Sequence, residues 1–458
     1  MVEEKKINRR DYLKYTGAAI GGLVVGGALG YLAKPTEVAE KTVTAPGTTV
    51  TVPTTITTTV ATAMPVTITF AEPSDTAEVN LKSLIKKWSK LRSDVIIEHV
   101  PLPTTADEQY RMLVTRLEGK VGPDIFILDD QWIAPFAEAE WVYPIDEQIS
   151  LASIKAQYLP NIIETVGIYK GHLWGLPYWP DVHVTFYRKD LLEKYGFEPP
   201  KTWDDLINTA TAIMKKEENM IGYTWMGMEY EGLVCFFLWV LWSFGGEWID
   251  QDGKVRINEP PAIEALQLLY DLIHKYRISP EGVLTYAEEE ARMPFHEGRA
   301  IFHTNWTYVW GTSQAEDSPI KDKIWLTTNP HPPDKKPASI IGAWFLGINR
   351  DTKYLDKVID FYMWYTNYEN EKWRMLSDYP FISVRKDIYE DSEILEKWPH
   401  AKVLYEVEQT ARARPRHPKY AMMSKALSKY VHAALTGSIE PKTALDKLAD
   451  ETKQIIGS

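Results

Sequence analysis

Apolar residues after residue 65 fall into short strand-like runs that alternate with longer amphipathic segments. The runs PVTITF and DVIIEHV have the β-branched content of strands, and the later run PDIFIL is apolar at nearly every position. A continuously apolar strand between helices is typical of a parallel sheet covered on both faces. The pattern therefore predicts an α/β fold that begins with strand 65–70, helix 79–91, strand 94–100, helix 105–118 and strand 123–128.

The second half of the chain continues this alternation and ends in helices. Residues 229–244 are apolar on nearly every side, which predicts a deeply buried helix. Shorter runs at 299–302 and 344–348 have the pattern of strands, and the tail from 383 to 456 is expected to be almost entirely helical. Two further helices are predicted at 260–276 and 287–296.

The run GHLWGLPYWPDVHVTFYRKDLLEKYGFEPPKTWDDL at 171–206 joins an aromatic loop, a strand-like stretch and a helix with its start signal. Thr202 and Asp205 have the spacing of a capping box before an apolar helix, so we interpret that half of the run as scaffold. In the other half, Trp179 and Asp181 stand at the start of the strand-like stretch. A strand there would carry a ring and a carboxylate to a ligand.

The first 34 residues have the pattern of an export signal that can also serve as a membrane anchor. Arg9 and Arg10 form a twin-arginine pair, and nineteen uncharged residues follow from Tyr15 to Ala33. At about 1.5 Å per residue, that length is just enough to cross a bilayer core of about 30 Å. No small-residue cleavage motif follows, so we expect a retained anchor, with a cleaved signal peptide or a buried soluble helix as alternatives.

Residues 35–64 are dominated by threonine. Twelve of the 27 residues from Thr36 to Thr62 are threonine, with Pro46 and Pro53 between them. This composition offers too little bulky apolar surface to offset the entropy lost on ordering, so we expect a disordered, extended stalk. The β-branched content would also suit a strand, but large residues do not alternate.

Composition excludes several classes of function. A formal net charge of −12 argues against nucleic acid as a partner, because phosphate binding needs basic stripes. The one cysteine, Cys235, excludes an intrachain disulfide, and its apolar surroundings predict inert core. The ten histidines are scattered, so neither a metal nor a cofactor is predicted. The 17 Trp and 25 Tyr residues suit core packing, and a sugar-stacking surface also needs them.

Aromatic and polar residues gather in four short segments. A pyranose presents apolar C–H faces, on which rings stack, and a rim of hydroxyl groups, which carboxylates and guanidinium groups bind. For any single tryptophan, core packing is the simpler interpretation, but the polar partners in each segment favour a saccharide site. The segments are YWPD at 178–181, TNWTY at 304–308, GAW at 342–344 and ARPRHP at 413–418.

Two details of these candidates depend on the local backbone. Trp306 and Tyr308 point the same way if the backbone there is extended, and they diverge if a helix begins there. Asp129 and Asp130 end the apolar strand 123–128, at the edge of the sheet where α/β proteins bind ligands. Exposed turn positions are the alternative for both aspartates.

Six segments together resemble family 1 extracellular solute-binding proteins of sugar ABC importers, most closely the archaeal trehalose/maltose-binding type. The resemblance extends from residue 66 to 457 and implies an α/β, two-lobed periplasmic-binding-protein-like fold (type II, maltose-binding-protein-like) with an interlobe ligand cleft and hinge crossings. Lobe 1 would comprise 65–178 plus 345–375, and lobe 2 would comprise 179–344 plus 376–458. The segments are PDIFILDDQWIAPFAEAEWVYPID, LWGLPYWPDVHVTFYRKDLLEKYGFEPPKTWDDL, WSFGGEWIDQDGKV, FHEGRAIFHTNWTYVWG, IGAWFLGIN and ARPRHPKY.

The resemblance also implies a set of ligand-binding residues. Relatives often have an arginine in the helix that begins near Thr105, but here Tyr110 stands at that position with Arg111 beside it. In the first loop, both Glu72 and Glu78 are candidates for an acidic contact. The implied set is Thr105, Asp129, Asp130, Trp179, Asp181, Trp306, Tyr308, Gly342, Trp344 and Arg414.

The implied function is an extracytoplasmic receptor for maltose, trehalose or a related oligosaccharide, which delivers its ligand to an ABC transporter permease by hinge closure. We expect a monomer without enzymatic activity, held at the extracellular face of the cytoplasmic membrane by its N-terminal segment, or secreted if that segment is cleaved. Three alternatives stay open. A surface glycoside hydrolase would also use Trp platforms and paired carboxylates. An adhesive surface protein would need no aromatic cleft, and a solute-binding protein could take a non-sugar solute such as glycerol phosphate.

Overall fold

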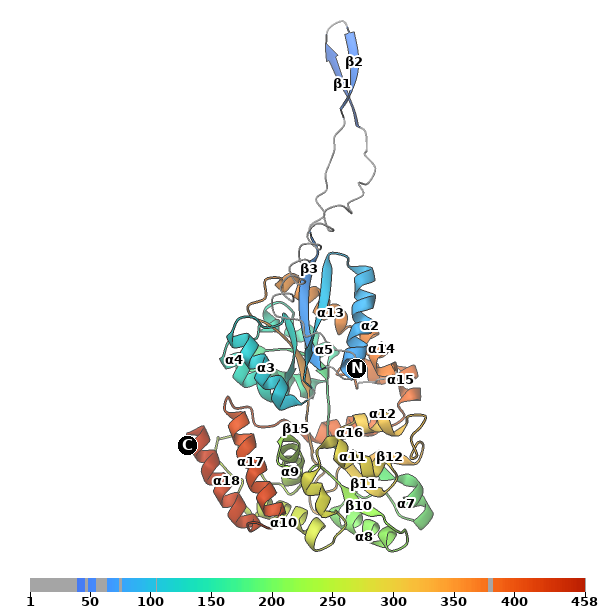
Figure 1. Cartoon of the computed structure of the whole chain (residues 1–458), viewed down its shortest axis with the longest axis vertical. Helices are drawn as coiled ribbons and strands as arrows, with labels where there is room; N and C mark the ends of the chain where they lie inside the picture. Colours follow the sequence, from blue (N-terminus) through green and yellow to red (C-terminus); the bar gives the residue numbers. More distant parts are fainter. Residues whose placement is uncertain are drawn as a thin grey trace, which may run out of the picture. The chain divides into compact units, whose positions relative to one another are not determined.

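The computed structural model describes residues 39–45, 48–54, 64–73, 76–103, 105–377 and 382–457 (Figure 1). Contacts divide the chain into two compact units, Met1–Met64 and Pro65–Ser458. The predicted signal or anchor segment, with its apolar stretch Tyr15–Ala33, lies outside the described residues. Within the described ranges, no helix combines the length and the apolar character needed to cross a bilayer.

The first unit contains an antiparallel pair of strands where the sequence predicts a disordered stalk. Strand β1 (Ala39–Ala45) pairs with β2 (Thr48–Thr54) along its whole length. The prediction for 35–64 is therefore wrong for these two strands. Threonine and valine are β-branched residues that favour extended backbone, and the main-chain hydrogen bonds of a hairpin do not require alternating large side chains.

Five strands form the first sheet of the second unit, in the order β4-β3-β5-β14-β8. Strands β3, β4 and β5 run parallel, whereas β14 is antiparallel to β5 and β8. The strands predicted at 65–70, 94–100, 123–128 and 344–348 are all confirmed. The bounds are β3 (Val66–Pro73), β4 (Val95–Leu102), β5 (Ile125–Asp129), β8 (Leu176–Trp179) and β14 (Trp344–Ile348).

Helices cover both faces of this sheet (Figure 1). On one face, Trp88 of α2 and Phe361 of α13 lie with their rings 5.2 Å apart, and Phe361 also packs on Phe70 of β3. On the other face, Tyr110 of α3 packs on Phe136 of α4. All five residues of β5 are buried, as its continuous apolar sequence predicts. The bounds are α2 (Thr76–Leu91), α3 (Ala106–Glu118), α4 (Ile133–Glu138) and α13 (Leu355–Tyr365).

Four strands form the second sheet, in the order β10-β11-β9-β12. Helix α9 (Glu231–Ser243) is buried along nearly its whole length, which confirms the prediction for 229–244. The capping box of Thr202 and Asp205 is also present at the start of α8. The other bounds are β9 (Val184–Arg188), β10 (Ile221–Thr224), β11 (Ala300–Asn305), β12 (Ile324–Thr327), α7 (Lys189–Tyr195), α8 (Trp203–Met214), α10 (Pro260–His274) and α11 (Glu288–His296).

Two passages of the chain between the two sheets lie next to each other, and a later passage runs through α16 (Ala401–Thr410), which contacts β12 and β13 (Ser339–Ile340). The chain leaves β8 of the first sheet and enters β9 of the second, and it returns through β13 to β14. Val182 and Ile341 pair there as an antiparallel bridge. These two segments, 180–183 and 340–343, are called the crossing. A short strand near the C-terminus, β15 (Ala411–Arg412), runs parallel to β13 and brings the later residues to the same place.

The C-terminal part is helical, as predicted, except for β15. Helix α17 packs against α9 and α18, and Leu159 donates its backbone N–H to the carbonyl of Val384 over 2.8 Å. The bounds are α14 (Tyr368–Leu376), η5 (Lys386–Glu390), α15 (Ser392–Lys397), α16 (Ala401–Thr410), α17 (Tyr420–Leu435) and α18 (Pro441–Ile456). Shorter elements are η1 (Asp130–Trp132), η2 (Ile145–Glu147), α5 (Leu151–Gln157), α6 (Pro160–Ile162), η3 (Ile163–Gly167), β6 (Ile168–Tyr169), β7 (His172–Leu173), η4 (Glu281–Thr285) and α12 (Tyr308–Ser313).

Candidate functional site

A cavity of about 340 Å³ lies beside the crossing, and we call it the inner compartment. Its volume falls in the range usual for small-molecule sites. The segments that line it come from both sheets and from the helices that begin near them. Seven of the ten predicted site residues line it, namely Thr105, Asp129, Asp181, Trp306, Gly342, Trp344 and Arg414.

Asp181 ties the crossing together through both its side chain and its backbone. Its Oδ1 accepts from the N–H of Val182 over 2.9 Å, and from the N–H and the hydroxyl of Thr307 over 2.9 and 2.8 Å. Its backbone carbonyl accepts the N–H of Gly342 over 2.8 Å. Burial raises the pKa of the Asp181 carboxyl to about 7, although the hydrogen bonds from Thr307 and Val182 oppose that shift. Asp181 therefore lines the inner compartment and also holds the two segments of the crossing to each other and to Thr307.

Arg414 is buried among three carboxylates. Its Nη2 donates to Asp129 Oδ1 over 2.7 Å and also to Asp130, and its Nη1 donates to Glu231 Oε1 over 2.9 Å. Burial raises the pKa of Asp130 well above its ordinary value, and the guanidinium of Arg414 only partly opposes this effect. Because Asp129 ends β5 and Glu231 begins α9, one guanidinium joins an element of each sheet region.

Glu231 is a site residue that the sequence reading missed. It stands in the first turn of α9, lines the inner compartment, and accepts hydrogen bonds from Tyr420 over 2.6 Å and from Ser424. Burial raises the pKa of its carboxyl, and Arg414 lowers it in part. The sequence signal that could have indicated Glu231 is a single carboxylate at the start of an otherwise apolar helix.

Two tryptophan rings form apolar walls of the inner compartment. The ring of Trp306 lies 4.0 Å from that of His183, and a Cβ added to Gly342 would stand 2.6 Å from the Trp306 ring. Gly342 is therefore what lets this ring lie against the crossing. Trp344 opens β14, and its ring lies 5.4 Å from that of Trp179.

Three predicted site residues do not line the inner compartment. A helix begins at Tyr308, so its side chain diverges from Trp306 and its hydroxyl donates to Glu289 over 2.6 Å. Trp179 packs behind Trp344, and Asp130 lies in the ion pair with Arg414. The structure thus places these three residues behind or beside the cavity.

The two glutamates considered for the first loop differ in what the structure describes. Glu72 is fully buried and accepts the hydroxyl of Tyr178 over 2.6 Å, which in turn lies 2.8 Å from the hydroxyl of Tyr365. The guanidinium of Arg374 lies 4.5 Å from the centre of the Tyr178 ring. Glu72 therefore supports β8 from inside the fold, whereas the side chain of Glu78 lies outside what the structure describes.

Cys235 also lines the inner compartment. The prediction of inert core is right about burial, since only 1% of the residue is exposed. However, its sulfur lies 3.8 Å from Nη1 of Arg414, so the thiol belongs to the wall of the site. Burial raises the pKa of the Cys235 thiol well above its ordinary value. Other lining residues that the sequence reading missed are Ala106, Asp107, Met228, Tyr230, Gly232, Ala287 and Glu288.

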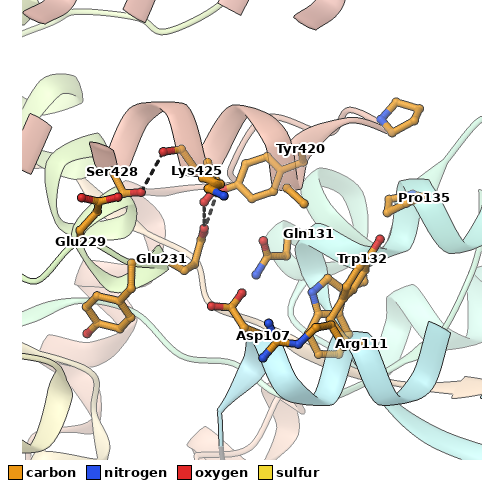
Figure 2. Close-up of a pocket in the computed structure, with 15 residues that line it drawn as sticks. Asp107, Arg111, Gln131, Trp132, Pro135, Glu229, Glu231, Tyr420, Lys425 and Ser428 are labelled. Atoms are coloured by element: carbon orange, nitrogen blue, oxygen red, sulfur yellow. Dashed lines mark hydrogen bonds between the residues drawn. The ribbon is translucent and has the colours of Figure 1, made fainter. Parts of the chain in front are cut away.

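A second cavity of about 360 Å³, the outer compartment, shares Asp107, Tyr230 and Glu231 with the inner one. Figure 2 shows Glu231 and Tyr420 on one side of it, with Arg111 and Trp132 across from them. Arg111, which stands beside the position where relatives often have an arginine, thus lies at this part of the cavity. Its remaining lining residues are Tyr110, Gln131, Pro135, Glu229, Pro418, Ala421, Ser424, Lys425 and Ser428.

The inner compartment is rich in carboxyl groups. Among the described residues that line it, Arg414 is the one cationic side chain. Burial also raises the pKa of the Glu288 carboxyl, with Tyr230 and Trp306 acting against the shift. Within the described part of the chain, no group of three His, Cys, Asp or Glu side chains is placed to hold a metal ion. The lining residues can stack their rings on a ligand and accept hydrogen bonds at their carboxyl oxygens. Ligands rich in hydroxyl groups bind through both kinds of contact. The acidic lining residues are Asp107, Asp129, Asp181, Glu231 and Glu288.

The model of a family described as bacterial extracellular solute-binding protein matches residues 74–372. A probable ABC transporter-binding protein of Deinococcus radiodurans is 33% identical over 384 residues, which cover 81% of this chain and 89% of that protein. A maltotriose-binding protein of Pyrococcus abyssi is 26% identical over 280 residues, or 60% of this chain and 57% of that protein.

Two solved structures also match most of this chain. Maltose-bound T. maritima MalE3 has a TM-score of 0.78 at 34% identity, covering 85% of this chain and 99% of that one. A solute-binding protein of Thermotoga lettingae, bound with alpha-D-tagatose, has a TM-score of 0.76 at 26% identity, covering 86% of this chain and all of that one (100%). These matches confirm the predicted α/β, two-lobed, maltose-binding-protein-like fold.

Proposed function

This chain belongs to the family of bacterial extracellular solute-binding proteins, and on that premise we propose that it is a saccharide receptor of an ABC transporter. The ligand would be maltose, trehalose or a related oligosaccharide, and the membrane partner would be the permease of that transporter. The observation that carries the proposal is the inner compartment, where the rings of Trp306 and Trp344 stand beside the carboxyl groups of Asp181 and Glu231. Rings and carboxyl groups match the two surfaces of a pyranose.

Delivery would depend on closure of the two lobes about the crossing. The inner compartment takes residues from both sheet regions, so a bound saccharide would contact both and stabilise the closed form. We propose lobes of 65–178 plus 345–375 and of 179–344 plus 376–458, although the bond between Leu159 and Val384 ties the segment near Val384 to lobe 1. The N-terminal segment would anchor the receptor outside the membrane.

An anionic solute such as glycerol phosphate fits the inner compartment less well. Both terminal nitrogens of the Arg414 guanidinium are already bonded to Asp129, Asp130 and Glu231. Among the described lining residues of the inner compartment, a phosphate group would meet carboxyl groups and, as unpaired cationic donor, only the Nε–H of Arg414. Arg111 and Lys425 line the outer compartment instead. A neutral saccharide meets no such repulsion.

A glycoside hydrolase needs a protonated carboxyl group and a second carboxylate on opposite sides of the scissile bond. In the inner compartment, Asp129 and Glu231 are both held by Arg414, and Asp181 is held by Thr307. These bonds suit a fixed binding wall, and the family match supports a receptor.

Calorimetry and tryptophan fluorescence with maltose, trehalose, glucose and glycerol phosphate test the proposal. We expect saturable binding of at least one saccharide, no binding of glycerol phosphate, and no product on chromatography. Trp306→Ala should abolish the signal, whereas Trp373→Ala, a half-buried ring that faces Lys87 on α2, should not. Product formation, or a preference for glycerol phosphate, would refute the saccharide receptor.

A further inference from the structure

The crossing has a second face, opposite the inner compartment. Val182 and Ile341 are bridge partners, and successive residues of an extended strand point to opposite faces. Asp181 and Gly342 line the inner compartment, whereas Val182 and Ile341 line a separate cavity of about 210 Å³. This second cavity, the rear cavity, therefore lies behind the two segments of the crossing.

The rear cavity is mainly apolar and reaches the solvent. Leu159 and Ile162 lie on one side of it, and both are almost fully buried. Lys386 and Tyr405 line both the rear cavity and a wider surface pocket of about 590 Å³, so the two spaces adjoin at these residues. Tyr405 is 48% exposed, which places its ring at the mouth.

Among the described residues, none bonds to the side chain of Glu408, the one carboxyl group that lines the rear cavity. Glu408 of α16 is only 5% exposed, and its backbone carbonyl accepts from Asn161 over 3.1 Å. In the part of the chain that the structure describes, no hydrogen bond or ion pair reaches its side chain. Burial raises the pKa of the Glu408 carboxyl to about 8, and the charge of Asp181 across the crossing adds to the shift. Since no described side chain bonds to this carboxyl group, a ligand that donates to it would replace solvent with a charge-assisted hydrogen bond.

We propose that the rear cavity is a second small-molecule site, which binds a compact organic ammonium ion. The apolar body of the ion packs against Ile162 and Ile341, and its N–H groups donate to Glu408. The charged or titratable groups around that carboxyl are Asp181 across the crossing, the half-buried Tyr389, whose pKa burial and the charge of Glu408 raise, and Lys386 and Tyr405 at the mouth. A charge-assisted bond of this kind is about twice as strong as a neutral one.

Binding of the ammonium ion requires Glu408 to be ionised. The carboxyl is mostly protonated below about pH 8, so the protein releases a proton when the ion binds at neutral pH. The affinity for the ion should therefore rise between about pH 6 and about pH 8. A neutral alcohol of the same shape should show no such rise.

The test uses the full chain with methyl-labelled isoleucine, leucine, valine and methionine, titrated with isobutylammonium chloride and, in parallel, with isobutanol. The methyl resonances of Ile162 and Ile341 should shift and saturate with the ammonium ion, at an affinity about tenfold above that of the alcohol. Glu408→Gln should reduce the ammonium affinity to the level of the alcohol. Trp373→Ala, at a residue that lines neither cavity, should leave it unchanged.

Three results would overturn the proposal. One is the absence of saturable shifts at Ile162 and Ile341, and another is an unchanged ammonium affinity in Glu408→Gln. The third is a shift of the methyl resonance of Met228 without a shift of Ile162 and Ile341. Met228 lines the inner compartment, so this result would place the ion among the carboxyl groups there. Should Glu408→Gln fail to fold, Gln409→Trp changes an exposed lining residue and should block the cavity instead.

Discussion

The Nη2 group of Arg414 donates to Oδ1 of Asp129 over 2.7 Å, although the two residues lie 285 positions apart in the chain. The same guanidinium also reaches Glu231, at the start of α9. The end of β5 and the start of a helix in the other sheet region thus share one buried positive charge. Stability and ligand binding should both depend on it.

Arg414→Ala should destabilise the protein strongly and abolish saccharide binding. The substitution leaves buried carboxylates without a counter-charge, which typically costs about 3–5 kcal/mol. Urea unfolding and calorimetry measure the two effects. Arg412→Ala removes a more exposed ion pair, with Glu247, and should cost less than about 1 kcal/mol. Equal losses in the two variants would contradict a special role for Arg414.

Asp181→Asn should make the free energy of unfolding less dependent on pH. The pKa of the Asp181 carboxyl is about 7 in the folded protein, against about 3.9 for an ordinary aspartate. The folded state therefore binds this proton more tightly, and the stability it contributes is lost as pH rises from about 4 to about 7. Relative to wild type, the urea midpoint of Asp181→Asn should increase across that window. A difference that stays constant with pH would show that the carboxyl does not titrate in this way.

Asp181→Ala should abolish saccharide binding, because Asp181 is one of the predicted ligand-binding residues, and it should also affect stability. Alanine also removes the acceptor for the N–H and hydroxyl of Thr307, so the start of α12 should loosen. Asparagine retains that acceptor oxygen. We therefore expect Asp181→Ala to lose both binding and stability at pH 6, and Asp181→Asn to lose mainly binding. Full saccharide affinity in both variants would remove Asp181 from the binding site.

Gly342→Ala should weaken saccharide binding by displacing Trp306. The added Cβ would stand 2.6 Å from the ring, and overpacking of this kind costs about 1–3 kcal/mol. Calorimetry with the saccharide measures the loss of affinity. The difference in tryptophan emission between Gly342→Ala and wild type, compared in the Trp306→Ala background, reports the displacement of the ring. Gly119→Ala is the matched control, because the atom nearest to an added Cβ, the carbonyl oxygen of Thr115, lies 3.4 Å away and the φ of Gly119 is −75°. An unchanged affinity in Gly342→Ala would mean that Trp306 does not contact the ligand.

Cys235 should act as a reporter of the inner compartment. It is the one cysteine in the chain, and burial raises its pKa, so N-ethylmaleimide should modify the native protein slowly and the urea-unfolded protein fast. A bound saccharide should slow the native reaction further, because it covers the wall that contains the thiol. Intact-mass spectrometry follows the rate. A rate that saccharide leaves unchanged at saturation would place the ligand elsewhere.

Local patterns predicted much of the fold. The apolar run at 123–128, the capping box at Thr202 and the buried helix at 229–244 each depend on neighbours in sequence, and each is confirmed. The site was harder to predict, because its contacts are non-local. Nothing near Glu231 indicates that Arg414 will reach it, and the direction of Tyr308 depended on whether a helix began there. The strands β1 and β2 were missed because pairing, rather than side-chain alternation, orders them.

The sequence separation between Asp129 and Arg414 also affects when the ligand site can form during synthesis. During synthesis, the first sheet is complete in sequence only after β14, and Arg414 follows later still. Until Arg414 is synthesised, Asp129 and Asp130 lack the guanidinium that binds them in the folded protein, so the ligand site is incomplete. A ribosome-bound chain that ends before Arg414 should therefore not bind saccharide, even if the first sheet has already folded.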